Sequence, residues 1–256
     1  MSITANYLFK GKQYIFDLTK PIDLSLELRA DKSNPNAWYQ PPPQIKPVET
    51  GNWVGRVKEG ASTNFNTIVF NPHAHGTHTE CLGHITAEFY SINSTLKSFV
   101  SLAQLITIEP KKEEEDYQIT LDQIKAKLSD SIYPSLIIRT LPNTSDKKSR
   151  HYSHSNPPYL HRDAVAFLAK QNIKHLLVDL PSIDKEKDQG KLEAHKAFWN
   201  VCDVNNLNQD ARIEATITEL LYVDQQVIDG LYFLNLQVAP IKNDASPSRP
   251  VIYPLL

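Results

Sequence analysis

The sequence predicts a single α/β domain, because short apolar runs rich in β-branched residues alternate with segments of helical periodicity. Runs of four to eight such residues, bounded by polar or proline-containing segments, are typical of β-strands. They lie at residues 67–70, 136–141, 175–180, 213–217 and 231–238. A chain of this length fits one large domain, which we expect to span residues 1–256.

Two helices are expected between these strands. In residues 121–128 the apolar side chains recur as Leu121, Ile124 and Leu128. In residues 160–171 a similar spacing of three and four places several apolar side chains on one helical face. The alternation of strands and helices favours the α/β class but does not give the order of the strands.

Residues 31–53 are expected to form a long, largely irregular segment. The three consecutive prolines at 41–43 remove backbone donors and fix φ. Long loops in compact domains often bind ligands, and this one carries Trp38, Tyr39 and Trp53. These aromatic side chains are expected either to cover a flat substrate or to pin a surface loop.

Composition excludes several classes of partner. The net charge is -2, with 22% charged residues, so no long-range field favours nucleic acid or anionic lipid. No stretch approaches the roughly 20 apolar residues of a membrane span. Lys10 and Lys12 interrupt the region where a signal peptide needs an apolar run. We therefore expect a cytoplasmic protein with a small-molecule partner, and contacts with neither nucleic acid nor membrane.

The strongest functional signal is a cluster of histidines. Residues 73–84 read His-Ala-His-Gly-Thr-His-Thr-Glu-Cys-Leu-Gly-His, directly after the predicted buried strand at 67–70. Imidazole nitrogen and carboxylate oxygen are ligands of Zn²⁺ and Mn²⁺, and such an ion can activate water near neutral pH. The cluster therefore predicts metal-assisted hydrolysis.

Spacing within the cluster predicts separate roles. His78 and Glu80 are two residues apart, so an extended backbone places both on one face, where they can bind one ion. His84 follows Glu80 by four residues. We expect His84 to move a proton between the attacking water and the leaving group, because imidazole titrates near neutral pH.

The histidines that begin the cluster share no helical or strand period. Gly76 permits backbone conformations closed to other residues, so we expect it to let His73, His75 and His78 turn inward. Two of the three can then bind one ion.

Further along the chain stand Asp-Leu-Pro-Ser-Ile-Asp at 179–184 and a tail at 236–249 that includes Ala-Ser-Pro-Ser-Arg. With the cluster, these segments resemble the cyclase-like metal-dependent hydrolases, the family of bacterial kynurenine formamidases and isatin hydrolases. The family signature is a histidine, then Gly-Thr-His, then x-Asp-x-Pro-x-His, and residues 76–84 occupy the same place. The resemblance covers nearly the whole chain in the expected order.

The resemblance implies a barrel-like β core flanked by helices, of the swivelling β/β/α type, in a homodimer or higher homo-oligomer. It also implies two further metal ligands, His195 in Glu-Ala-His-Lys and Glu219 in Thr-Glu-Leu. Together with His73, His78 and Glu80, they are expected to hold one or two divalent ions, Zn or Mn.

The chain departs from the family signature in three ways. The first signature histidine normally stands at the position of Ala74, so His73 must substitute, with His75 as the alternative. We expect a bulge to absorb the extra residue. Glu80 replaces the family's aspartate, and residues 81–83 lack its proline.

The expected function is hydrolysis of the amide bond of a small aromatic formamide. The resemblance implies N-formylkynurenine as the leading substrate, and a lactam or lactone as the alternative within the family. The competing classes are a non-catalytic protein that binds metal or a small molecule and an exposed patch that scavenges metal. A His84→Ala variant that loses rate but keeps its metal would indicate a hydrolase.

Overall fold

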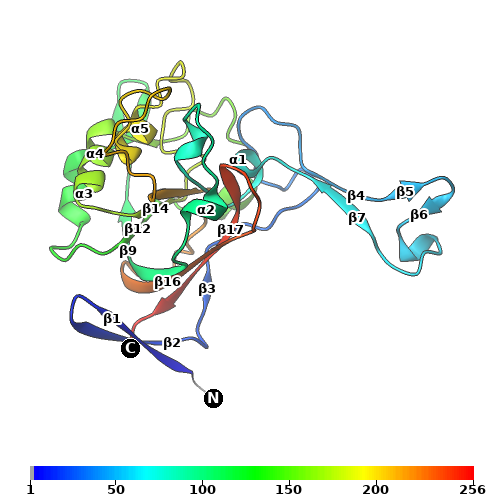
Figure 1. Ribbon diagram of the computed structural model, residues 1–256, viewed down its shortest axis with the longest axis horizontal. Coiled ribbons are helices and arrows are strands. Elements are labelled where there is room, and N and C mark those ends of the chain that lie inside the picture. The colour runs from blue at the N-terminus through cyan, green and yellow to red at the C-terminus, as the bar shows by residue number, and fades with distance from the viewer. Residues whose placement is uncertain (1–2) are drawn as a thin grey trace.

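The computed structural model describes residues 3–256 and is organised around a closed β-barrel (Figure 1). The strand order is β16-β9-β12-β14-β15-β8-β17, and β17 pairs back onto β16. A short strand, β3 (Ile22–Asp23), adds to β17. The barrel strands are β8 (His78–Glu80), β9 (Val100–Ile108), β12 (Ser135–Thr140), β14 (His175–Val178), β15 (Thr216–Glu219), β16 (Gly230–Val238) and β17 (Ala245–Pro254).

The central strands are parallel and buried on both faces, which explains their unbroken apolar runs. Strand β12 pairs in parallel with β9 and with β14, and β14 pairs in parallel with β15. The buried apolar residues form two hydrophobic cores. Leu136 and Ile138 pack into the core that also contains side chains of the helices, whereas Ile137, between them, packs into the other core. Such two-sided burial is the rule for parallel sheets.

Helices cover one side of the barrel (Figure 1). They are α3 (Leu121–Lys127), α4 (Arg162–Lys170) and α5 (Glu193–Trp199). Helix α3 begins at a capping box, in which Thr120 and Gln123 satisfy each other's backbone N–H groups. The buried face of α4 carries Val165 and Leu168, which pack into the same core as β12.

The remaining elements are short. They are the β1 (Thr4–Phe9) and β2 (Lys12–Asp17) hairpin, the small sheet of β10 (Lys111–Glu113), β11 (Asp116–Ile119) and β13 (Tyr159–Leu160), and the one-turn helices α1 (Pro72–His75) and α2 (Ile92–Thr95). Single 3-10 turns lie at Val57–Glu59, Leu82–His84 and Ser145–Ser149. No helix within residues 3–256 has the length and apolar character needed to cross a membrane.

An arm projects from the barrel (Figure 1). It consists of β4 (Gln44–Pro47) paired with β7 (Asn66–Val69), and of β5 (Glu49–Thr50) paired with β6 (Trp53–Val54). We define residues 44–69 as the arm.

The arm corrects two predictions. Residues 67–70 were expected to form a buried strand, but Ile68 and Val69 are 52% and 57% exposed, because β7 pairs only with β4 and leaves the core. Residues 31–53 were expected to be largely irregular. This holds for residues 31–43, apart from the bridge between Asn36 and His151, but strand pairing begins at Gln44, directly after the prolines.

The α/β class and the barrel-like core are confirmed, as are most of the predicted elements. The helices expected at 121–128 and 160–171 are α3 and α4, each within a few residues of the predicted bounds. The strand expected at 213–217 is shifted to Thr216–Glu219. This shift matters for the site, because it places Glu219 in the barrel wall.

Stability is expected to depend on pH through His175, at the start of β14. The side chain is 5% exposed, its Nδ1 lies 2.8 Å from Thr216 Oγ1, and burial lowers its pKa to about 4. An unfolded histidine titrates near 6.5, so unfolding takes up a proton between these values. This contribution is complete above about pH 6.5 and is lost as the pH falls toward 4, at up to about 1.4 kcal/mol per unit.

Urea unfolding at pH 7.5 and pH 4.5 tests this expectation. His175→Asn removes the titrating ring, so the wild type should lose more free energy of unfolding between the two pH values than the variant. Equal losses would show that His175 does not carry this dependence.

Candidate metal centre

The predicted ligands converge where β8 passes between two neighbouring strands of the barrel wall. β8 pairs with β15 on one side and β17 on the other, and Glu219 stands opposite His78 in the β15 register. His78 and Glu80 are fully buried, and the extended conformation predicted for them is confirmed. His78 Nε2 lies 4.0 Å from Glu80 Oε2 and 3.5 Å from Glu219 Oε2.

Two buried polar atoms at this point have no hydrogen-bond partner. They are His78 Nε2 and Glu80 Oε2. His78 Nδ1 lies 3.0 Å from the carbonyl oxygen of Gly76, which can only accept, so Nδ1 carries the proton and Nε2 presents a lone pair. Buried acceptors without partners are costly in a folded protein, and a divalent cation satisfies both at once. The donor set therefore fits a metal ion.

Helix α5 contributes His195, whose side chain reaches Glu80 on β8. Asp184 accepts hydrogen bonds from the backbone of Ala194 and of His195 and lies 2.6 Å from His195 Nδ1. The ring is thereby held with Nε2 at 3.0 Å from Glu80 Oε1. Glu219 is held in turn, because its Oε1 accepts the N–H of Ile183 at 2.9 Å.

The one-turn helix α1 separates the two histidines that compete for the first ligand position. Residues two apart on a helix point about 200° apart. His73 faces the cluster, with Nδ1 at 3.1 Å from Glu80 Oε2. His75 faces away: its Nδ1 accepts the N–H of Asn71 and its Nε2 donates to Pro41 O.

The backbone explanations offered for this region were wrong. The extra residue is accommodated by the helical turn, not by a bulge. Gly76 has φ 170° and ψ -172°, an extended conformation that any residue adopts, and a Cβ there would meet nothing closer than 3.8 Å. In this region the glycine with no room for a side chain is Gly83, where a Cβ would lie 2.3 Å from Tyr90 O.

Charges in the cluster are balanced by protons on imidazoles. Burial lowers the pKa of His73, but the carboxylates of Asp244 and Glu80 outweigh it and raise the pKa to about 10. Burial also disfavours charge on His195, yet Asp184 and Glu80 hold its pKa well above the ordinary value. The pKa of Glu80 is well below its usual range, because its imidazole neighbours outweigh burial. A divalent ion bound here would replace these protons.

His84 lies at the outer side of the cluster, in the turn after β8. Its side chain is half-buried, and its Nε2 lies 3.7 Å from Glu80 Oε2. Its ring stacks on that of His73, with centroids 4.2 Å apart. The structure thus brings His84 together with His73, His78, Glu80, His195 and Glu219.

The sequence pattern of the putative cyclase family matches residues 17–185 of this chain. The chain belongs to this family. Two kynurenine formamidases are also similar. That of Bacillus cereus (strain ATCC 10987 / NRS 248) is 26% identical over 200 residues, which cover 77% of this chain and 84% of the relative. That of Bacillus mycoides (strain KBAB4) is 24% identical over a stretch of the same length.

Solved structures share the putative cyclase fold. A predicted metal-dependent hydrolase from Bacillus stearothermophilus superimposes with a TM-score of 0.63 at 20% identity, over 91% of this chain and 98% of that one. An isatin hydrolase bound to the product analogue thioisatinate superimposes with a TM-score of 0.65 at 14% identity, over 92% of both chains. At these identities the likeness establishes the architecture.

Sequence reasoning on this putative cyclase missed two residues of the site. Asp184 was quoted within the 179–184 element without a role, although it contacts His195. Asp244 was not singled out, yet its Oδ2 lies 2.9 Å from His73 Nε2 and 3.4 Å from His84 Nδ1. Only its position directly before the Ala-Ser-Pro tail could have indicated it.

The aromatic residues expected to bind substrate lie in three different places. Trp38 packs against a small buried group that includes Leu220, the residue after Glu219. Tyr39 is exposed, and its hydroxyl donates to Glu186. Trp53 lies on β6 of the arm, away from the cluster within one chain (Figure 1). Of the three, Trp38 is the one packed beside a strand of the site.

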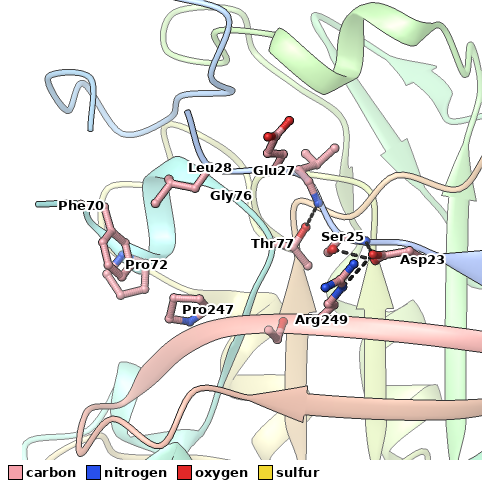
Figure 2. A pocket seen from close by; sticks show the side chains of 12 residues that line it. Asp23, Ser25, Glu27, Leu28, Phe70, Pro72, Gly76, Thr77, Pro247 and Arg249 are labelled. Atoms are coloured by element: carbon pink, nitrogen blue, oxygen red, sulfur yellow. Dashed lines mark hydrogen bonds and ion pairs between the residues drawn. The ribbon is translucent and has the colours of Figure 1, made fainter. Parts of the chain in front are cut away.

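A cavity of about 490 Å³ lies beside residues 76–77, directly before β8, but no histidine of the cluster lines it (Figure 2). At its rim, Asp23 accepts hydrogen bonds from Ser25 Oγ and from Arg249 Nε. Thr77 lines it, whereas His78, the next residue, belongs to the cluster. Side chains of consecutive extended residues point to opposite sides, which separates the cavity from the ligands.

Proposed function

We propose that this putative cyclase is a metal-dependent hydrolase that cleaves the amide bond of a small aromatic formamide similar to N-formylkynurenine. The observation that carries the proposal is the pair of buried acceptors without partners, His78 Nε2 and Glu80 Oε2, with His73, His195 and Glu219 around them. The similarity to kynurenine formamidases supports the choice of substrate.

The proposed ligands fit Zn or Mn, with one or two ions per chain. Mixed imidazole and carboxylate donors are typical of these ions. A bound ion would supply Lewis acidity, which lowers the pKa of water and polarises the substrate carbonyl. Asp184 holds the ring of His195, and the N–H of Ile183 holds Glu219, so that the donors are pre-oriented.

His84 is assigned the proton transfer. It is the histidine of the cluster with the most open side chain, and one of its nitrogens faces Glu80. It can accept the proton of the attacking water and deliver it to the departing amine nitrogen, so that the amide and water become a carboxylic acid and an amine.

Elemental analysis and a substrate panel test the proposal. Protein purified without chelator or histidine tag should contain one or two equivalents of Zn or Mn, and His78→Ala should lose them. His151→Ala, which removes an exposed histidine outside the cluster, serves as the matched control. A wild type that neither contains nor takes up a divalent ion would refute the proposal.

The second candidate is hydrolysis of a cyclic amide or lactone, supported by the structural similarity to isatin hydrolase. Initial rates on an aryl formamide and on a lactam distinguish the two. We expect the larger kcat/KM for the formamide, and the reverse order would select the cyclic substrate.

We further propose that the chain forms a homodimer or larger homo-oligomer through the arm. Six apolar side chains of the arm are exposed in a single chain: Ile45, Trp53, Val57, Phe65, Ile68 and Val69. Ile45 and Ile68 stand opposite each other in the ladder between β4 and β7, and neighbouring exposed apolar side chains can mark interaction sites. Light scattering on the wild type should give at least twice the chain mass of 29.0 kDa, and Ile68→Glu with Val69→Glu should give the monomer. A monomeric wild type at micromolar concentration would contradict the assignment.

A further inference from the structure

We propose that Asp244 is a positioning residue whose carboxylate orients His73 as a metal ligand and His84 as the proton carrier. The inference rests on the proposed hydrolase function. It concerns a residue that the spacing of the histidines did not indicate, far along the chain from both rings.

The barrel fixes Asp244 beside the site. The next residue, Ala245, stands opposite Glu80 in the ladder between β17 and β8. The backbone oxygen of Asp244 accepts the N–H of Cys81 at 3.0 Å. The backbone of Asp244 is therefore fixed relative to β8 by main-chain hydrogen bonds.

The two rings stand side by side between two carboxylates. Asp244 Oδ2 lies 2.9 Å from His73 Nε2 and 3.4 Å from His84 Nδ1. On the opposite side, Glu80 Oε2 lies 3.1 Å from His73 Nδ1 and 3.7 Å from His84 Nε2. The rings stack with an interplanar angle of 29°. Each ring thus presents one nitrogen to Asp244 and the other to Glu80.

This arrangement selects a tautomer for each ring. Both carboxylates can only accept, but an ion bound beside Glu80 would require lone pairs on the nitrogens that face it. The protons of the neutral rings then lie on the nitrogens that face Asp244, Nε2 of His73 and Nδ1 of His84. The lone pairs of the neutral rings then point toward Glu80. This leaves His73 Nδ1 free to ligate and His84 Nε2 free to accept a proton.

Glu80 supports the same assignment. Its Oε2 has no hydrogen-bond partner, although His73 Nδ1 is 3.1 Å away, whereas His73 Nε2 and Asp244 Oδ2 form a hydrogen bond. Asp184 stands behind His195 in the same manner, at 2.6 Å from Nδ1. A carboxylate behind a ligating imidazole is the usual device that fixes its tautomer.

The competing role is direct ligation, in which His73, His84 and Asp244 hold a cation of their own. His73 Nε2 would then bind that cation, and its proton would move to Nδ1 and remove His73 from the site beside His78. The hydrogen bond between His73 and Asp244 favours the positioning role. If Asp244 is a ligand, its removal lowers the number of ions per chain. If it positions the rings, that number stays the same.

The test compares Asp244→Ala and Asp244→Asn with Asp163→Asn, which removes an exposed carboxylate from α4. Zn²⁺ affinity is measured by competition with a chromophoric chelator, and ions per chain by elemental analysis. We expect Asp244→Ala to weaken binding about 10- to 100-fold at unchanged stoichiometry, the usual cost of removing such a partner. Asp244→Asn, which keeps an oxygen acceptor, should lose less, and the control nothing.

A double variant shows whether Asp244 acts through His73. In the His73→Ala background, Asp244→Ala should add little further loss of Zn²⁺ affinity, because the ring it orients is gone. The side chain of Asp244 is 23% exposed, so its truncation leaves no closed cavity, and a thermal melt verifies folding.

Three results would overturn the inference. Loss of one ion equivalent in Asp244→Ala would make the residue a ligand. Unchanged affinity would leave it without a role at the site, and independent losses in the double variant would show that it does not act through His73. A wild type that binds no divalent ion is a different result, because it refutes the proposed function itself.

Discussion

Replacing His84 with alanine should lower kcat by about 10²- to 10⁴-fold, the usual contribution of a general acid–base group, while the ion content stays the same. The reason is geometric. His84 Nε2 faces Glu80 from 3.7 Å, and the side chain of His84, which is 29% exposed, is the most open among the cluster histidines. His84 is therefore expected to carry protons and not to hold the ion.

The measurement is the kinetics of formamide hydrolysis together with elemental analysis of the same preparation. An unchanged KM with a reduced kcat would locate the loss in the chemical step. His151→Ala again serves as the control. Loss of the ion in His84→Ala would make His84 a ligand, and full activity with full ion content would exclude it from the reaction.

Replacing Asp179 with alanine should lower the free energy of unfolding by about 3–5 kcal/mol, the cost of leaving a buried charge without its partner. Lys147 and Asp179 are both buried. The Lys147 ammonium donates hydrogen bonds of 2.8 Å to Thr140 O, Thr140 Oγ1 and Asp179 Oδ2. Asp179 also accepts the backbone N–H of Thr140 at 2.9 Å, so truncation removes a second partner from the same buried group.

Urea unfolding measures the loss of free energy of unfolding in Asp179→Ala. Two further variants serve as comparisons. Asp146→Ala breaks an exposed pair with Arg150 in the same segment and should cost less than about 1 kcal/mol. Lys147→Met combined with Asp179→Leu removes both charges and should recover most of the loss. If Asp179→Ala loses no more free energy of unfolding than Asp146→Ala, the pair of Lys147 and Asp179 is not buried in solution.

Strands that are buried on both faces could be predicted, because their sequences are continuous apolar runs. Strands β12 and β14 are apolar on both faces, so their runs were recognisable at 136–141 and 175–180. Strand β7 shows the same composition but lies on the arm, because local composition does not reveal whether a strand has a core to face. β17 escaped prediction since it contains Pro247 and Pro250.

The site was predictable in part. His78 and Glu80 could be paired from spacing alone, because alternation within a strand is a local property. His195 and Glu219 could be assigned only through the resemblance to the family, because an isolated His or Glu gives no such indication. Asp184 and Asp244 escaped, since they act behind other side chains and only the folded barrel brings them there.

The closed barrel makes the site depend on strand β17. Strand β8 lies between β15 and β17, and Thr79 contacts Thr218, 139 residues further along. During synthesis the histidines leave the ribosome long before either flanking strand exists. A nascent chain therefore carries the imidazoles without the wall that aligns them. A product truncated before Ala245 would expose the edges of both β8 and β16, which are templates for aggregation. Alignment of the candidate ligands on β8 therefore depends on β17 being in place.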